Sequence, residues 1–382
     1  MGGRDYNPFI SFYGEHCISP VHQDISDFRA HLARREKLYR LLGMPPAVFT
    51  GKTILEVGPG GGYNTLAFFN WGADVDFVEP NSKAQEEIPV LLNQYGIGRE
   101  RWTLFPDKIE KFNSGKKYDV VIAEGFIPGL YNISEVVSKI AGLVNPGGVA
   151  VVTCIDDISF FFENVKRLVA TRLIQEATDF NEKIQILARA FASHLRCLKH
   201  ASRPVEDWVT DQFLNPALYA NLFSIEDCVR EFGEEFAFLG SSPSMFTDYS
   251  WYKDLEFDSR EAVVNQFRRK RHLLILWDLD ESLRSTEDND ALFKAVCELR
   301  AFSGKIGDDL DKQNIEIIVG LLRRIAGLTQ DIDPRIPEAI DEAIALLSDK
   351  NLDEVKVSKA SRLAAAFGRG QQYVSMVRGF AS

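Results

Sequence analysis

One acidic residue followed by a run of glycines marks the part of the sequence best suited to bind a ligand. The stretch TILEVGPGGGYNT covers residues 53–65; Glu56 lies in its apolar run, and glycine fills four of the five positions 58–62. Glycines directly after a buried strand let the backbone approach a ligand closely and expose amide N–H groups where a helix begins. We therefore expect a binding site at this loop.

Details of the loop favour a cationic ligand over a phosphorylated one. A phosphate-binding P-loop ends in Lys followed by Ser or Thr, and no such pair closes this loop. A dinucleotide-binding loop needs a third glycine at position 63, which is Tyr63. Glu56 would repel a pyrophosphate but attract an ammonium or sulfonium group.

The surrounding sequence alternates between strand and helix patterns, which predicts an α/β fold with a doubly wound, mostly parallel sheet of seven strands. An amphipathic helix is expected at 23–44. The expected strands are residues 53–57, 74–80, 101–106, 118–124, 148–156, 235–242 and 272–279. The expected domains are an N-terminal segment (1–50), a ligand-binding domain (51–157 and 223–285), a helical insertion (158–222) and a helical C-terminal region (286–382).

The motif Glu56-Val57-Gly58-Pro59-Gly60-Gly61-Gly62 resembles the E-x-G-x-G-x-G motif of class I S-adenosyl-L-methionine (SAM)-dependent methyltransferases. The resemblance covers roughly 51–157 and 224–280. It implies SAM as cofactor, Glu79 on the ribose hydroxyls, Asp107 near the adenine and Glu124 facing cofactor and substrate. The cofactor-binding residues it implies are Glu56, Gly58, Pro59, Gly60, Gly61, Asn64, Glu79, Pro80, Asp107, Lys108 and Glu124. The N-terminal segment 11–25 and the segment 222–254 are also similar to methyltransferases found with bacterial surface-glycan genes.

Catalysis on an alcohol would need a base to take the acceptor's proton. The candidates are Glu124, because of its place after the fourth strand, and His22, because a histidine titrates near neutral pH. His16, Asp156 and Asp157 are weaker candidates. Asp156 and Asp157 could also hold Mg²⁺ together with Glu124, but we expect no metal.

The acceptor is expected to be a small molecule or a glycan-like compound that is methylated on oxygen. Aromatic side chains could line its pocket, although they could equally form a hydrophobic seam; they are Trp208, Phe213, Tyr219, Phe223, Phe246, Tyr249, Trp251 and Tyr252. The basic segment 267–272 could bind a phosphate, or be a solvated helix end.

The composition of the chain limits which binding partners and which cellular compartment we expect for it. The net charge of -11 argues against a nucleic-acid partner, because phosphates require a basic face. No apolar run is long enough to span a bilayer. Five cysteines without CxxC spacing favour reduced thiols and a cytoplasmic protein. The sequence leaves the oligomeric state open.

Two other functions remain compatible with these patterns. The chain could bind SAM without turnover and act as an interaction module through its helical C-terminal region. It could also be an NAD(P)-dependent oxidoreductase.

Overall fold

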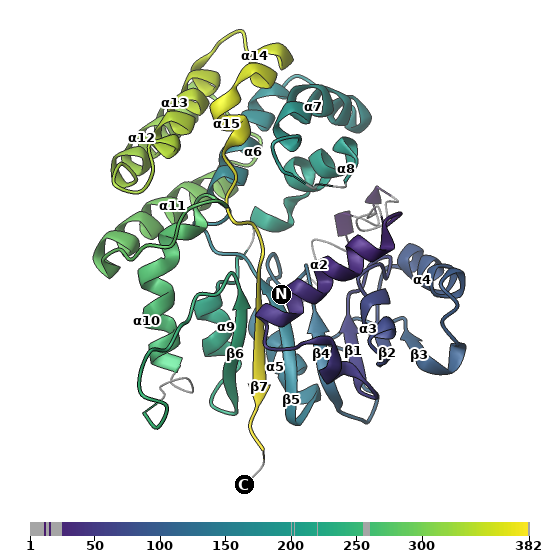
Figure 1. Cartoon of the computed structure of the whole chain (residues 1–382). Helices are drawn as coiled ribbons and strands as arrows, with labels where there is room; N and C mark the ends of the chain where they lie inside the picture. The colour runs from purple at the N-terminus through teal and green to yellow at the C-terminus, as the bar shows by residue number, and fades with distance from the viewer. Residues whose placement is uncertain are drawn as a thin grey trace, which may run out of the picture. The chain divides into compact units, whose positions relative to one another are not determined.

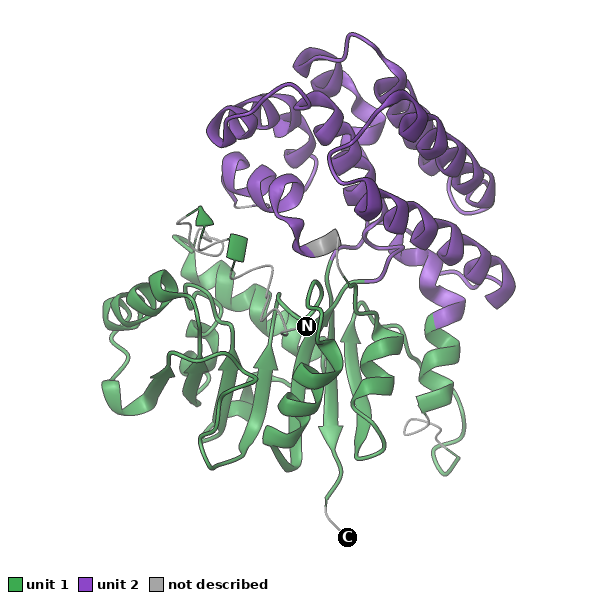
Figure 2. Ribbon diagram, turned by 180° about the vertical axis from the view of Figure 1, so that it is seen from behind, with its two compact units in different colours: residues 1–155, 221–267, 371–382 green, residues 156–220, 268–370 purple. Residues whose placement is uncertain are grey.

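A computed structural model describes residues 11–12, 15–16, 25–199, 201, 203–219, 221–254 and 260–380 of the chain. The chain divides into two compact units, coloured green and purple in Figure 2. Unit 1 comprises Met1–Ile155, Asn221–Phe267 and Gln371–Ser382, and unit 2 comprises Asp156–Ala220 and Arg268–Gly370. Unit 1 contains the sheet and the glycine-rich loop, and unit 2 is built from helices (Figure 2).

Unit 1 is organised around one seven-stranded sheet in the order β3-β2-β1-β4-β5-β7-β6 (Figure 1). The strands are β1 (Thr53–Val57), β2 (Asp74–Val78), β3 (Trp102–Phe105), β4 (Tyr118–Ala123), β5 (Val144–Cys154), β6 (Phe236–Ser242) and β7 (Gln372–Arg378). β7 runs antiparallel to β5 and β6, while the other neighbouring strands are parallel. This is the sheet expected for a class I methyltransferase fold.

The parallel strands bring their carboxyl ends to one edge. In β1 and β2 all residues but the first are buried, as expected for strands covered on both faces. Glu56 of β1 is in register with Phe77 of β2 and Ile122 of β4. The residues that follow these three strands therefore meet at one edge of the sheet, where ligands bind in open α/β folds.

Three helices of unit 1 begin at side-chain caps. They are α2 (Phe28–Leu41), η1 (Pro46–Phe49), α3 (Leu66–Asn70), α4 (Ser82–Gln94), η2 (Arg99–Arg101), α5 (Ile133–Leu143) and α9 (Ile225–Glu231), and α10 (Arg260–Lys270) spans the boundary between the units. Asp27 caps α2 and Asn81 caps α4, and each side chain accepts a backbone N–H from the first turn. Ser224 and Asp227 form a capping box at α9.

An aromatic core holds α2 against the sheet. The Tyr39 ring lies 5.4 Å from that of Phe49, 5.3 Å from that of Phe68 and 5.6 Å from that of Trp71, measured between centroids. These side chains belong to one buried cluster that also includes residues of β1, β2, α3 and α4. In Figure 1 the purple helix α2 crosses in front of the strands. The N-terminal helix is therefore a fixed part of unit 1.

Unit 2 combines two inserted segments of the chain. Its elements are α6 (Phe161–Leu173), α7 (Phe180–Leu195), α8 (Val205–Val209), η3 (Thr210–Leu214), η4 (Pro216–Tyr219), η5 (Arg271–Leu274), α11 (Thr286–Ile306), α12 (Lys312–Leu328), α13 (Arg335–Ser348), α14 (Glu354–Lys359) and α15 (Ser361–Ala365). Arg189 of α7 pairs with Glu354 of α14 at 2.6 Å. The buried Lys166 of α6 donates to the carbonyl of Ala366 at 2.5 Å. Segments far apart in sequence thus share one core.

The prediction of a last strand at 272–279 is wrong. Part of that segment forms η5, with Leu274, Ile275 and Leu276 buried in unit 2, and the seventh strand is β7, about a hundred residues later. A short apolar run does not distinguish a buried strand from another buried segment. The C-terminal region is consequently not helical throughout, because its last part returns to the sheet between β5 and β6.

The domain boundaries in the structure also differ from those expected. Segment 156–220 packs with 268–370 in a single unit, whereas the sequence patterns suggested an insertion at 158–222 separate from a C-terminal region. Which inserted helices share a core depends on contacts between distant residues, and local periodicity carries no information about them. Among the described helices, none is both long enough and apolar enough to cross a membrane.

Candidate functional site

The glycine-rich loop adopts a backbone that only glycine accepts easily. Gly58, Gly60 and Gly62 have φ angles of 65°, 57° and 79°, in the left-handed region where a Cβ atom is disfavoured. A Cβ atom on Gly58 would also lie 3.2 Å from the ring of Phe126. The loop therefore brings bare backbone to the edge of the sheet, which is the geometry needed for close approach of a ligand.

Glu56 is a buried carboxyl group at the end of β1. Its side chain accepts a hydrogen bond from the hydroxyl group of Thr65, and the residue is 3% exposed. The pKa of Glu56 is raised to about 8, mainly by burial; the neighbouring Glu124 and Glu79 also raise it, whereas the hydrogen bond from Thr65 and the charge of Arg35 lower it. A positive charge placed nearby would stabilise the ionised form.

Glu79 follows β2 and reaches the glycine loop. One carboxylate oxygen accepts the backbone N–H of Gly60 at 3.1 Å, and the other accepts that of Asn81 at 2.8 Å. Burial raises the pKa of Glu79 to about 7, and these two N–H groups act in the opposite direction. The acidic residue expected at the end of the second strand is thus attached directly to the loop.

Glu124, after β4, joins three parts of unit 1. Arg35 of α2 donates from Nη1 at 3.0 Å and from Nη2 at 2.7 Å, one to each carboxylate oxygen. The hydroxyl of Tyr39 donates at 2.8 Å, and the side-chain amide of Asn64 in the loop donates at 3.3 Å. A carboxylate that accepts four hydrogen bonds is held rigidly and is poorly placed to take a proton from an acceptor.

The buried polar side chains of α2 were not anticipated from the sequence. His31, Arg35 and Tyr39 are spaced by four residues, so they project from one face of the helix, and all three are buried. His31 bonds the carbonyl of Tyr63 in the loop through Nε2 at 3.1 Å, and burial lowers its pKa. The spacing of these three side chains by four residues on an otherwise apolar face is the feature of the sequence that could have identified them.

The other residues predicted to bind the cofactor or to act in catalysis differ in where they lie. Pro59, Gly61 and Pro80 lie in the loops after β1 and β2, as the order of the chain requires. Asp107 is exposed after β3 and is not the cap of a helix, and Lys108 beside it is half-buried. His22 lies outside the described residues, so its catalytic role stays a prediction.

Asp156 and Asp157 form ion pairs inside unit 2. The guanidinium of Arg271 donates to Asp156 at 2.8 and 2.7 Å, and Arg300 donates to Asp157 at 2.5 Å. Burial raises the pKa of Asp156, while Arg271 opposes that effect. The described part of the chain shows no group of three or more His, Cys, Asp or Glu residues that could hold a metal ion.

The basic segment 267–272 is used internally. Lys270 pairs with Glu281 at 2.7 Å, Arg271 pairs with Asp156, and His272 contacts the hydroxyl of Ser282 at 3.0 Å. All three basic residues are nearly buried. Lys270, Arg271 and His272 are therefore used in internal contacts, while Arg269 in the last turn of α10 is exposed, as expected for a solvated helix end.

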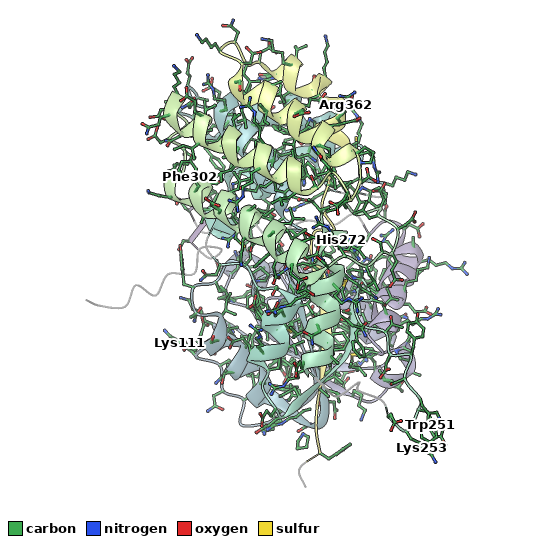
Figure 3. All side chains as sticks on the ribbon, turned by 90° about the vertical axis from the view of Figure 1, so that its left-hand side faces the viewer. Lys111, Trp251, Lys253, His272, Phe302 and Arg362 are labelled. Carbon is green, nitrogen blue, oxygen red and sulfur yellow. The ribbon has the colours of Figure 1, made fainter. Side chains whose placement is uncertain are left out.

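The predicted aromatic cluster is divided. Trp208 and Phe213 pack with ring centroids 5.2 Å apart in the core of unit 2. Tyr249 and Trp251 belong to unit 1 and are 93% and 58% exposed. Trp251 and Lys253 lie together at the outer edge of the view in Figure 3, with the ammonium group 5.1 Å from the ring. The described members of the predicted aromatic cluster are therefore divided between the two units.

Comparison with known proteins identifies the type of domain. Residues 28–201 match a protein family described as "Methyltransferase domain". No curated protein matches the chain. Residues 28–201 therefore correspond to a methyltransferase domain.

Several solved structures resemble parts of the chain. They include the CcbJ methyltransferase from Streptomyces caelestis (20% identity, 30% of this chain and 49% of that one, TM-score 0.28), the glycopeptide N-methyltransferase MtfA complexed with SAM (21% identity, 29% and 50%, TM-score 0.26) and PKMT2 from Rickettsia typhi in complex with AdoHcy (16% identity, 62% and 49%, TM-score 0.40). The chain thus spans about half the length of these proteins.

Proposed function

We propose, from the premise that residues 28–201 form a methyltransferase domain, that this chain transfers the methyl group of SAM to an acceptor oxygen. The observation that carries the proposal is the attachment of Glu79 to the glycine loop through the backbone N–H of Gly60. A buried carboxylate beside exposed backbone suits a ribose with two hydroxyl donors. A second buried carboxyl group, Glu56, favours a cationic ligand at the same place, because a nearby positive charge stabilises its ionised form.

The residues present fit this cofactor. The left-handed glycines present bare backbone beside Phe126, where a Cβ atom on Gly58 would press on the ring, and the carboxyl groups of Glu56 and Glu79 suit a ligand that carries positive charge. We assign the ribose hydroxyls to Glu79 and the charged amino-acid and sulfonium end to the side of Glu56. When bound, SAM supplies an electrophilic methyl group.

The contribution of this chain to methyl transfer is mainly positioning. The reaction is an in-line displacement, in which holding the two reactants in line supplies much of the acceleration. The bonds from Arg35, Tyr39 and Asn64 to Glu124 fix helix α2 and the loop against the end of β4. We therefore propose Glu124 as a positioning residue rather than the base, and His22 remains the proposed base for the acceptor's proton.

A small-molecule or glycan-like acceptor is the finer part of the proposal. The acidic chain, with a net charge of -11, supports an acceptor other than a nucleic acid. We propose that unit 2 contributes to the specificity for the acceptor. Because segments 156–220 and 268–370 share one core, a deletion that tests this contribution has to remove both segments. The cysteines of the described residues form no disulfide, which supports a reducing compartment such as the cytoplasm.

Binding and product assays test the proposal. Isothermal titration calorimetry of the full chain is expected to show binding of SAM and of S-adenosylhomocysteine (SAH), and none of NAD(P). Incubation with SAM and a panel of hydroxylated acceptors is expected to release SAH. Tight binding of NAD(P) alone would point instead to an oxidoreductase, and SAM binding without SAH release from any acceptor would favour an interaction module.

A further inference from the structure

We infer that the carboxyl group of Glu56 distinguishes the charged methyl donor from its neutral product, because it releases a proton when a sulfonium enters the site. The inference rests on the proposed function, since it takes SAM and SAH as the ligands of the glycine loop. It adds a property that the loop alone does not imply: the affinity for donor relative to product changes with pH.

The inference begins from the charges around Glu56. Two further carboxyl groups face the same loop, Glu79 from the end of β2 and Glu124 from the end of β4. From α2, Arg35 and the phenol of Tyr39 are directed at Glu124. Both terminal nitrogens of Arg35 are therefore already used by another carboxylate.

The immediate surroundings of Glu56 favour its neutral form. The side chain is buried and its hydrogen bond is to the uncharged hydroxyl of Thr65, which is itself fully buried. Desolvation penalises the ionised carboxylate and is the largest influence on its pKa; Glu124 and Glu79 act in the same direction, while Thr65 and Arg35 oppose desolvation without cancelling it. In the ligand-free protein Glu56 consequently carries a proton at neutral pH.

A sulfonium at the loop reverses this balance. A positive charge a few ångströms away stabilises the ionised carboxylate, so the proton leaves Glu56 for the solvent. SAH has a neutral thioether in place of the sulfonium, so it stabilises the ionised form of Glu56 less than SAM does, while the ammonium group common to both ligands acts equally. The ribose and the amino-acid end are the same in both ligands, so any titration of Glu79 contributes equally and cancels in the comparison.

Calorimetry of the full chain measures the released protons directly. SAM and SAH are each titrated at pH 7.0 in two buffers of different ionisation enthalpy. We expect more protons to be released per SAM than per SAH, with a difference of up to about one. Glu56→Gln should remove this difference. Glu79→Gln is the matched control: it should change proton release with both ligands by the same amount and keep the difference.

A second measurement needs no variant. The ratio of the Kd for SAH to the Kd for SAM should rise with pH between 6 and 8, by up to about tenfold per pH unit, and level off above that range. Equal proton release with both ligands, or a ratio independent of pH, would overturn the inference and leave the proposed function standing. Binding of neither ligand would overturn both.

Discussion

Arg35 and Glu124 lie 89 residues apart in sequence and meet in a two-pronged ion pair, with Nη1 at 3.0 Å and Nη2 at 2.7 Å from the carboxylate oxygens. Both side chains are less than one-tenth exposed. The pair fixes the N-terminal helix to the carboxyl end of β4, beside the glycine loop. A buried pair of this kind is costly to break from one side, because the remaining charge is left without its partner.

Removing Arg35 should therefore damage both stability and cofactor binding. We expect Arg35→Ala to lower the free energy of unfolding by about 3 kcal/mol and to weaken SAM binding, since Glu124 is left buried and Asn64 loses a fixed partner. Arg35→Lys should restore only part of the loss, because an ammonium group cannot bond both carboxylate oxygens in the same way. Chemical denaturation and calorimetry measure the two effects.

Arg40 on the same helix supplies the control. Its side chain is 64% exposed and lies 3.9 Å from Glu36. Arg40→Ala should change stability by less than about 0.5 kcal/mol and leave SAM binding unchanged. Equal effects of the two alanine variants would show that the pair with Glu124 has no special role.

Glu79 should determine affinity for the nucleoside. Glu79→Ala removes the acceptor of the proposed ribose hydrogen bonds and also leaves the Gly60 N–H unpaired, so we expect SAM and SAH binding to weaken by about 1–3 kcal/mol each. Asp107→Ala is the comparison variant, because Asp107 is exposed and should cost less. Unchanged SAM affinity in Glu79→Ala would contradict the assignment of the cofactor site.

Gly58 should tolerate no side chain. Its φ of 65° and the 3.2 Å approach of Phe126 to a Cβ atom both penalise alanine, so Gly58→Ala should destabilise the protein by about 1–3 kcal/mol. Gly142 in α5 has nothing within 4 Å of a Cβ atom and no left-handed φ. Gly142→Ala should be neutral or stabilising by up to about 1 kcal/mol. Thermal denaturation of the two variants tests the contrast.

Burial of Glu56 should make the protein less stable at high pH. Its folded-state pKa of about 8 is higher than that of an unfolded glutamate, so the native state binds the extra proton. Stability contributed by that proton is present below the unfolded pKa and is lost as pH rises toward 8, by up to about 1.4 kcal/mol per pH unit. Glu56→Gln should therefore gain stability relative to the wild type between pH 5 and pH 8.

That difference is measured by urea denaturation of both proteins at pH 5, 6.5 and 8. Carboxyl groups remote from Glu56 titrate identically in the two proteins and cancel. A stability difference that does not change with pH would show that Glu56 is already ionised throughout the range.

The sequence by itself determined the frame of the site. Alternating apolar runs predicted β1 to β6 close to their observed bounds, because strands buried on both faces need such runs. The order of a parallel sheet then placed Glu56, Glu79 and Glu124 at carboxyl ends that meet at one edge. Glycine at positions 58, 60 and 62 predicted a loop whose backbone approaches a ligand closely, and these glycines adopt left-handed φ angles in the structure.

Only the tertiary structure decided the partners of these residues. The seventh strand, the pairing of Arg35 and Tyr39 with Glu124, and the joining of 156–220 with 268–370 all depend on contacts between distant parts of the chain. An apolar run such as 272–279 is equally compatible with a strand and with another buried segment. The sequence of α2 likewise does not tell whether Arg35 faces solvent or pairs with a carboxylate. The choice depends on what else the fold brings alongside, and local sequence patterns do not record it.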